Sequence, residues 1–290
     1  MKILLAYDGT VGAQAAVDDL LHAGLPLKTQ ARIVTVTESW MPPPSSLELL
    51  GGRERESEAF IQARDAAVAI RTTFPEWEVT PQSQFGSPGN ILLEIADHWK
   101  PDLIIVGSHG RSAIGRFFLG SVSQKIVTAA HCSVRVARGR IEEQETPLRL
   151  IIGIDGSAGA TAAVEAVAER NWPPGTEVRL INASWNLPLM GHEDAAAALA
   201  EWVAAAKKQL QEKMDEATEK LQAHGLQVSS VIKQEDPKHL LCNEAEKWGA
   251  DCIFVGAQGI SKIERLLLGS VSASVAARAH CSVEIVRART

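Results

Sequence analysis

Short apolar runs alternate with amphipathic segments along the whole chain. In the first half, this pattern predicts strands over residues 2–7, 32–37, 78–85, 103–107 and 133–137. Helical spacing separates these strands, over residues 12–24, 47–73, 90–99 and 121–130. The alternation predicts an α/β fold in which helices cover both faces of a parallel sheet.

The second half contains a longer helical pattern. Among many Lys, Glu and Gln side chains, apolar residues recur at helical spacing, at Val203, Leu210, Met214, Ala217 and Leu221. This stripe predicts a surface that faces the core, and a groove for a partner helix is the alternative.

Two segments of the chain repeat each other. The segment VGSHGRSAIGRFFLGSVS begins at Val106, and VGAQGISKIERLLLGSVS begins at Val255, 149 residues later. The sequence AHCSV occurs twice, and YDGT from Tyr7 aligns with IDGS from Ile154. Two copies of one domain therefore follow each other in the chain.

Length and charge agree with this organisation. The chain has 290 residues, of which 46% are hydrophobic, and its net charge is −6. We predict one domain over residues 1–138 and another over 148–290, joined by the polar linker GRIEEQETP at 139–147. The negative charge argues against a nucleic-acid-binding surface. No apolar run approaches the roughly 18 residues of a membrane span, and the apolar start is too short for a signal peptide, so we expect a cytoplasmic protein.

The four cysteines, Cys132, Cys242, Cys252 and Cys281, show no CxxC spacing. This argues against both a zinc ribbon and a disulfide framework. The His-Cys pairs at 131–132 and 280–281 provide too few ligands for a metal site, so a small buried thiol before a strand is the simpler interpretation.

The repeated loop has the residues of an anion site. Gly107 and Gly110 let a ligand approach the main chain closely, and Gly120 and Ser121 begin a helix. Unpaired N–H groups and the positive end of the dipole favour a phosphate there. The alternative is a tight turn that binds nothing.

Asp8 ends the first strand, and the glycine loop follows the fourth. If these strands are neighbours where the strand order reverses, the aspartate and the loop face one crevice. The alternative role for Asp8, and for Asp155 in the second copy, is an Asp-Gly turn or support of a helix cap.

With DGT after the first strand and HCSV before the last, these glycines resemble the universal stress protein family, and two copies in one chain resemble its tandem members. The resemblance implies two Rossmann-like, doubly wound domains, each with a five-stranded parallel sheet of order 3-2-1-4-5. It also implies that members with the full glycine motif bind ATP. We expect Mg²⁺ to accompany the ATP.

The resemblance assigns roles to residues of the first domain. Asp8 is expected on the ribose or adenine side, the main chain of Val36 at the adenine, and Gly107 against the ribose. Phosphates are expected at Gly110, Gly120, Ser121 and the amide of Val122. The equivalents in the second domain are Asp155, Ile181, Gly256, Gly259, Gly269, Ser270 and Val271.

The second domain departs from the pattern of the first. Ile260 replaces Arg111, Gln258 replaces His109, and Glu235 and Asp236 add negative charge after the third strand. Negative charge near a triphosphate weakens binding unless it is screened or bridged by a metal. We therefore expect the tighter nucleotide site in the first domain.

No constellation of catalytic residues stands out. Phosphoryl transfer needs neutralised charge and a positioned nucleophile, and His109 is the candidate base of the first loop. Its alternative role is a hydrogen bond within the loop. Together with the resemblance, the sequence favours a nucleotide-binding stress-response module with at most slow ATP hydrolysis. An adenine-nucleotide hydrolase or AMP-forming ligase, and a tandem scaffold that binds no nucleotide, are the alternatives.

The last strands of the two domains, SVRVA and SVEIV, are edges that need cover. The resemblance implies that they pair antiparallel, as an internal pseudo-dimer, and leaves a further homodimer open. Arg135 and Glu284 occupy equivalent places in them, and opposite charges across strands favour docking within the chain. Solvated edge protection is the alternative role of these charges.

Overall fold

The computed structural model describes residues 1–38, 52–109, 119–138, 147–183, 193–259 and 268–288. The first half contains β1 (Lys2–Ala6), α1 (Val11–Asp18), the 3₁₀ turn η1 (Asp19–His22), β2 (Gln30–Thr37), α2 (Gly52–Thr73), β3 (Glu78–Phe85), α3 (Pro88–Trp99), β4 (Leu103–Gly107), α4 (Ser121–Ala129) and β5 (Ser133–Ala137). The second half contains β6 (Arg149–Gly153), α5 (Ala158–Ala168), β7 (Glu177–Ala183), α6 (Glu193–Ala223), β8 (Gln227–Lys233), α7 (Pro237–Trp248), β9 (Cys252–Gly256), α8 (Ser270–Arg278) and β10 (Ser282–Val286).

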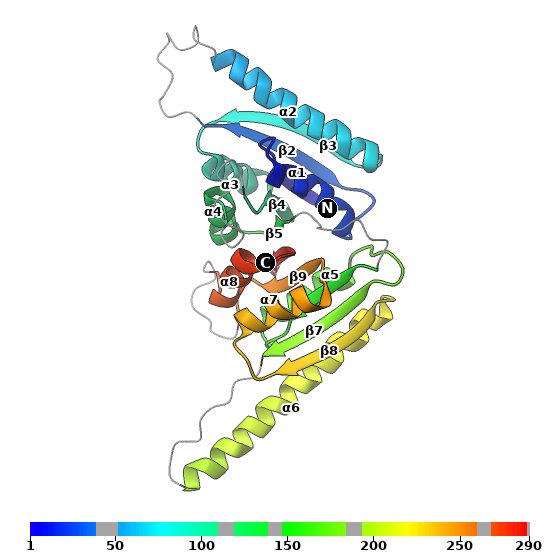
Figure 1. Ribbon diagram of the computed structural model, residues 1–290, viewed down its shortest axis with the longest axis vertical. Coiled ribbons are helices and arrows are strands. Elements are labelled where there is room, and N and C mark those ends of the chain that lie inside the picture. The colour runs from blue at the N-terminus through cyan, green and yellow to red at the C-terminus, as the bar shows by residue number, and fades with distance from the viewer. Residues whose placement is uncertain (39–51, 110–118, 139–146, 184–192, 260–267, 289–290) are drawn as a thin grey trace.

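All ten strands form one continuous sheet, in the order β3-β2-β1-β4-β5-β10-β9-β6-β7-β8 (Figure 1). Each half is parallel and has the predicted order 3-2-1-4-5. β1 therefore lies between β2 and β4, and β6 between β7 and β9. The strand order reverses at these neighbours, so the predicted switch point is confirmed.

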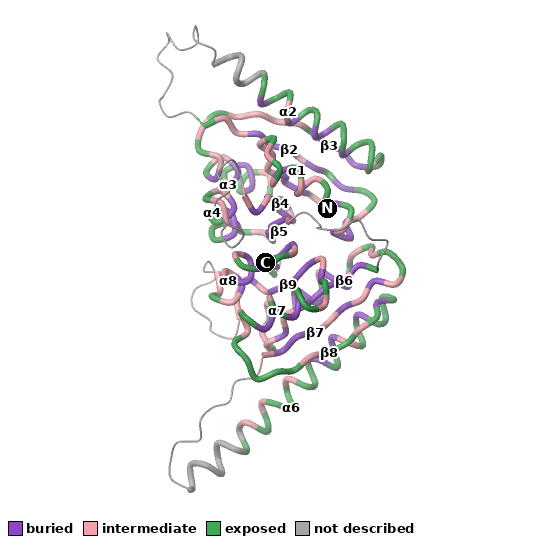
Figure 2. Tube along the Cα trace, in the orientation of Figure 1, coloured by how far each residue is buried: buried purple, intermediate pink, exposed green. Residues whose placement is uncertain are grey.

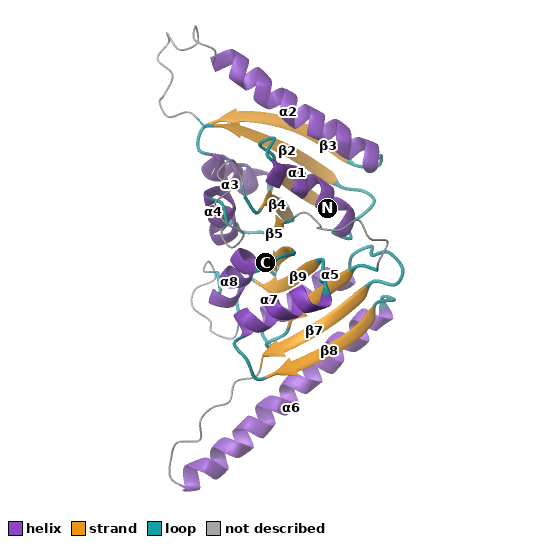
Figure 3. Ribbon diagram, in the orientation of Figure 1, coloured by secondary structure: helices purple, strands orange, loops and turns teal. Residues whose placement is uncertain are grey.

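Helices cover both faces of the sheet in each half (Figure 3). In the first half, α1 and α2 pack on the face of Ile3 and Leu5, whereas α3 and α4 pack on the face of Leu4 and Ile104. Successive strand residues point to opposite faces, so both faces of the central strands are apolar.

One predicted helix is interrupted. The sequence pattern predicts a single helix over residues 12–24, but α1 ends at Asp18 and the chain tightens into η1. This turn places the carboxylate of Asp19, which is only 7% exposed, against Arg135 of β5. The change from α-helix to 3₁₀ turn thus coincides with an ion pair between residues that are distant in the sequence.

The stripe on α6 faces the core over its C-terminal part. Met214, Ala217 and Leu221 are buried, and Leu210 packs at the edge of the same cluster. This agrees with the core-facing prediction for these four residues. Val203 lies outside the cluster, because the 31-residue helix runs on past the edge of the sheet (Figure 2).

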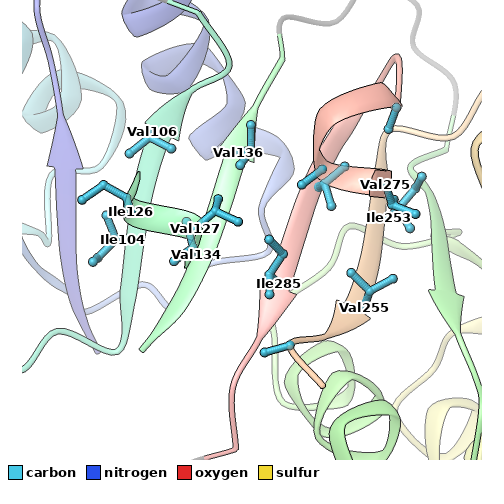
Figure 4. Packing of buried hydrophobic residues seen from close by; sticks show 14 of the residues in the cluster. Ile104, Val106, Ile126, Val127, Val134, Val136, Ile253, Val255, Val275 and Ile285 are labelled. Atoms are coloured by element: carbon cyan, nitrogen blue, oxygen red, sulfur yellow. The ribbon is translucent and has the colours of Figure 1, made fainter. Parts of the chain in front are cut away.

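The two halves join through their last strands, as the family resemblance implied. β5 and β10 pair antiparallel, with Val136 opposite Val283 and Val134 opposite Ile285. Valine and isoleucine side chains from β4, β5, β9 and β10 gather along one face of this junction, beside α4 and α8 (Figure 4). One apolar core therefore crosses from the first domain into the second.

Candidate functional site

The end of β4 and the start of α1 form a tight corner. A Cβ atom on Gly107 would lie 2.3 Å from the carbonyl oxygen of Gly12, and a Cβ on Gly12 would lie 2.0 Å from that of His109. Heavy side-chain atoms cannot approach so closely, so only glycine fits either position. The corner holds the first residues of the loop directly against α1.

The second domain repeats this corner with Gly256 and Gly159. A Cβ on Gly256 would lie 2.4 Å from the carbonyl carbon of Gly159, and one on Gly159 would lie 2.3 Å from the carbonyl oxygen of Gln258. Sequence reasoning missed Gly12 and Gly159. The signal was present, because DGTVG and DGSAG place a glycine four residues after each aspartate.

Asp8 supports the start of α1. Its Oδ1 accepts hydrogen bonds from the Thr10 main-chain N at 3.1 Å and from the Thr10 hydroxyl at 2.6 Å. The Thr10 hydroxyl oxygen in turn accepts from the Ala13 N at 3.2 Å, which caps the helix. Asp8 thus has the helix-cap role that was its alternative, at the end of β1 beside the switch point.

Asp155 is held in a similar turn and faces its glycine loop. Its Oδ1 accepts from the Ser157 N at 2.9 Å. A Cβ on Gly259 would lie 2.6 Å from the Asp155 Oδ2, so this carboxylate faces the loop directly. The structure therefore brings together two residues that the sequence had assigned to one site.

The helices that follow the two glycine loops begin without a side-chain cap. Gly120 precedes α4 and Gly269 precedes α8, and neither N-cap position makes a side-chain hydrogen bond. Ser121 and Ser270, the first residues of these helices, are exposed. The first-turn N–H groups of a helix have no partner within the helix, so this end favours an anion.

A buried serine ties each of these helices to the strand before it. The Ser123 hydroxyl donates to the Gly107 carbonyl at 2.6 Å, and the Ser272 hydroxyl donates to the Gly256 carbonyl at 2.6 Å. A second link closes the base of the first loop, where the Gly120 N donates to the Ser108 carbonyl at 2.9 Å. The sequence analysis missed both serines, although GSVS occurs in each repeat.

His109 is held within the loop. Its Nδ1 lies 3.0 Å from the Ser108 hydroxyl oxygen, and its Nε2 is enclosed with no hydrogen-bond partner among the described residues. No carboxylate is seen to orient the imidazole in the described part of this loop. The arrangement matches a loop hydrogen bond better than a general base, which needs such an orienting group.

Strand pairing corrects one alignment between the domains. The Tyr7 N donates to the Val34 carbonyl at 2.9 Å, and the Ile154 N donates to the Ile181 carbonyl at 2.8 Å. Ile181 is therefore the counterpart of Val34, two residues before Val36. The counterpart of Val36 is therefore Ala183. The sequence pointed to Ile181 because a run as short as β7 does not define the register by itself.

Other predicted residues fall into two groups. Val122 and Val271 are partly buried and pack against the shared core. Gly110, together with Arg111 and Ile260, lies outside the described residues.

One of the acidic residues after the third strand of the second domain has a structural role. The Asp236 Oδ1 accepts from the Lys238 N at 2.8 Å and caps α7. Its charge is thereby directed at a helix N-terminus.

A cavity of about 240 Å³ lies beside the Asp155 turn, between α5 and α6. Its floor includes Ile154 and Ala217. Two exposed ion pairs stand around it, Lys220 with Glu165 at 3.4 Å and Lys213 with Glu216 at 2.7 Å; all four residues line the cavity. These charges neutralise one another.

The cysteines before the last strands are protonated thiols at neutral pH. Burial raises the pKa of Cys132 to about 11 and that of Cys281 to about 12. A metal ligand or nucleophile would have to be a thiolate. Within the described ranges, no three His, Cys, Asp or Glu side chains are grouped so that they could hold a metal ion.

Comparisons with known proteins agree with this architecture. The sequence profile of the universal stress protein family matches residues 1–138 and 148–287. A universal stress protein of Mycobacterium tuberculosis is 26% identical and aligns over 98% of this chain and 96% of its own. The crystal structure of a universal stress protein from Archaeoglobus fulgidus is 20% identical, covers 99% of this chain and 96% of that one, and has a TM-score of 0.66.

A solved universal stress protein in complex with cAMP is 25% identical, over 49% of this chain and 98% of that one, with a TM-score of 0.33. The family profile covers nearly the whole chain. This chain therefore belongs to the universal stress protein family, and it contains two such domains in tandem. In the parts of the chain that the structure describes, no helix is both long and apolar enough to cross a membrane.

Proposed function

We propose that the first domain binds ATP, with Mg²⁺, and that the chain acts as a nucleotide-binding stress-response module. The observation that carries this proposal is the start of α4. Gly120 makes no side-chain cap there and Ser121 is exposed, so amides and a hydroxyl are available to phosphates. Because Ser123 anchors α4 to the end of β4, this anion-binding end is held at the switch point.

The other end of the nucleotide is proposed to lie toward β1 and β2. Asp8 is positioned by Thr10, and its carboxylate would accept from a ribose hydroxyl. The main chain near Val36, at the end of β2, would meet the adenine. The proposed functional units are residues 1–138 and 148–290, with 139–147 as the linker.

We infer weaker nucleotide binding in the second domain, through Gly269, Ser270 and the amide of Val271. There the Asp155 carboxylate directly faces Gly259, at the position equivalent to a phosphate contact. A fixed negative charge so close to phosphates opposes their binding.

The proposed module is not an efficient enzyme. His109 is bonded to Ser108 and lacks an orienting carboxylate in the described region, so hydrolysis is expected to be absent or slow. The proposal also requires access to an ATP pool, so a cytoplasmic location is part of it.

Isothermal titration with ATP and Mg²⁺ tests this function, using the full chain and the matched variants G120V and G269V. A bulky side chain at either helix start would block phosphate approach. We expect G120V to lose the tighter site and G269V to keep it. If the unmodified chain binds no nucleotide at millimolar ATP, the scaffold alternative replaces the proposal.

Turnover is measured separately, by phosphate release from ATP with Mg²⁺. The H109A variant is expected to change any slow release little. If H109A abolishes a measurable turnover, His109 is a base and the hydrolase alternative is correct.

A further inference from the structure

Four buried charges cross the junction between the domains in alternating order. Arg135 of β5 donates to Asp19 of η1 at 2.5 and 3.2 Å and to Glu284 of β10 at 3.3 Å. Glu284 is also bound by both terminal nitrogens of Arg170, which follows α5. Side-chain exposure is at most 8% for any of the four. We call Asp19, Arg135, Glu284 and Arg170 the charge tetrad.

The tetrad lies on one face of the junction, opposite the apolar face. In β5, Arg135 stands between Val134 and Val136, so its side chain points away from theirs. In β10, Glu284 stands in the same way between Val283 and Ile285. Arg135 and Glu284 lie directly opposite each other in the strand register. Their complete burial contradicts the alternative of solvated edge protection.

Further contacts across the domains fix the ends of the tetrad. The Ser282 hydroxyl of the second domain donates to Asp19 of the first at 2.8 Å. Arg170 of the second domain donates to the carbonyl of Ala23 in the first at 3.0 Å. Both outer charges are therefore held by the opposite domain as well as by their own partner.

The two domains carry this arrangement with reversed polarity. The counterpart of Arg135 is Glu284, while Asp19 and Arg170 match Ala166 and Ala23 in the repeat. At the junction, the first domain thus presents Arg135 paired with Asp19, and the second presents Glu284 paired with Arg170. Pairing two β5 edges would oppose Arg135 to Arg135, and pairing two β10 edges would oppose two glutamates.

We propose that the charge tetrad makes edge recognition heterotypic. The β5 edge accepts the β10 edge of this chain, whether its own or that of a second copy, and rejects another β5 edge. Buried like charges are strongly unfavourable, whereas the alternating row leaves each charge bonded to its opposite. The partner class is therefore a second domain with an acid at position 284 and a base at position 170.

Mixing two full-length variants tests this rule. R135E places an introduced carboxylate opposite Glu284, and E284R places an introduced guanidinium opposite Arg135, so neither chain can form the native junction internally. The mixture offers one native pair, the first domain of E284R with the second domain of R135E. We expect native mass spectrometry to show a mixed dimer, with at least a tenfold lower dimer fraction in either variant alone.

The neutral variants R135Q and E284Q repeat the mixture without an introduced charge, in case a reversed charge prevents folding. They should again give the mixed dimer, in smaller proportion. The matched control uses K213E and E216K, which alter an exposed pair within α6, and this mixture should stay monomeric.

The proposal fails if both mixtures remain monomeric while circular dichroism shows folded chains. It also fails if R135E alone dimerises as much as the mixture. A third contrary result is full recovery of thermal stability in the double variant R135E/E284R, because Asp19 and Arg170 would then not set the polarity.

Discussion

Arg138 and Arg287 occupy equivalent positions after β5 and β10, and each reaches main-chain carbonyls of the other domain. Arg138 donates to the Ala276 carbonyl at 2.5 Å, at the end of α8, and Arg287 donates to the Val127 carbonyl at 2.8 Å, near the end of α4. A cation at the C-terminal end of a helix is favourable because the carbonyls there carry negative partial charge. The two domains therefore hold each other through a reciprocal pair of contacts.

This exchange predicts that R138A and R287A each weaken docking. Each removes hydrogen bonds from a charged donor, and one such bond typically contributes about 1.5–3 kcal/mol. Thermal unfolding of each variant and of the double variant measures the loss. If the double variant unfolds at the temperature of the unmodified chain, these contacts do not stabilise the junction.

The charge tetrad predicts a larger loss for R135M. This change leaves Asp19 buried without its cation, and breaking a buried pair costs about 3–5 kcal/mol. K213M is the matched control, because Lys213 and Glu216 are both at least half exposed and such pairs contribute up to about 1 kcal/mol. Denaturant unfolding of the two variants compares them. Equal losses would show that burial does not decide the strength of the pair.

Glu284 predicts that docking weakens in acid. Burial alone would raise its pKa, but Arg170 and Arg135 outweigh burial and hold the pKa below the ordinary value of 4.5. Asp19 and Cys252 complete the ionisable surroundings of this cluster. A carboxyl group whose pKa is lowered in the folded state stabilises that state at pH values above its ordinary pKa. This stabilisation is lost as the pH falls through the lowered pKa.

The measurement is the unfolding free energy of the unmodified chain and of E284Q, from about pH 6 down to about pH 3. The difference between the two chains should be largest at the upper end and shrink toward the acidic end. A difference that grows in acid would reverse the sign of this argument.

The Ser123 hydrogen bond leads us to expect that the contact between β4 and α4 supports ligand binding. S123A removes the 2.6 Å hydrogen bond to the Gly107 carbonyl and is expected to destabilise the first domain by about 0.5–1.5 kcal/mol. Freed from β4, the start of α4 should also bind ATP more weakly. S272A removes the equivalent bond in the second domain and is the matched control. Titration of S272A should show that the tighter site, in the first domain, is unchanged. Equal loss in both variants would contradict the division between domains.

The close packing of Gly12 leads us to expect that a side chain at this position displaces the loop. In G12A the new methyl group would lie 2.0 Å from the His109 carbonyl oxygen, so β4, the loop or α1 must move. Overpacking of this kind typically costs about 1–3 kcal/mol. V11A, at a neighbouring residue that is 88% exposed, is the control. Chemical denaturation compares the two, and a G12A chain as stable as V11A would show that the corner yields easily.

Local pattern was sufficient for much of this fold. β3, β4 and β5 begin and end where the alternation and the apolar runs predicted, because the burial of a strand shows in the pattern of its consecutive residues. The repeat placed Arg135 and Glu284 at equivalent positions, and their antiparallel pairing followed from the family resemblance. These features depend on neighbours in the chain or on the comparison of two copies.

The remaining features depend on contacts between distant segments. Asp19 lies in η1 and Arg170 follows α5, and no local spacing indicates that Asp19 meets Arg135 and Arg170 meets Glu284 at the junction. The corner of Gly12 and Gly107 exists because a helix start and a strand end, 95 residues apart in the chain, are packed together.

The sequence by itself determined most strand positions of the first half, to within two residues, as well as the two domains and the repeated glycine motif, since periodicity and repetition are properties of the chain. Only the tertiary structure decided which charges are buried together, because burial and pairing arise where elements from both domains meet. The same contacts decided the register that makes Ala183, and not Ile181, the counterpart of Val36. A charge becomes a strong constraint only after packing removes it from water.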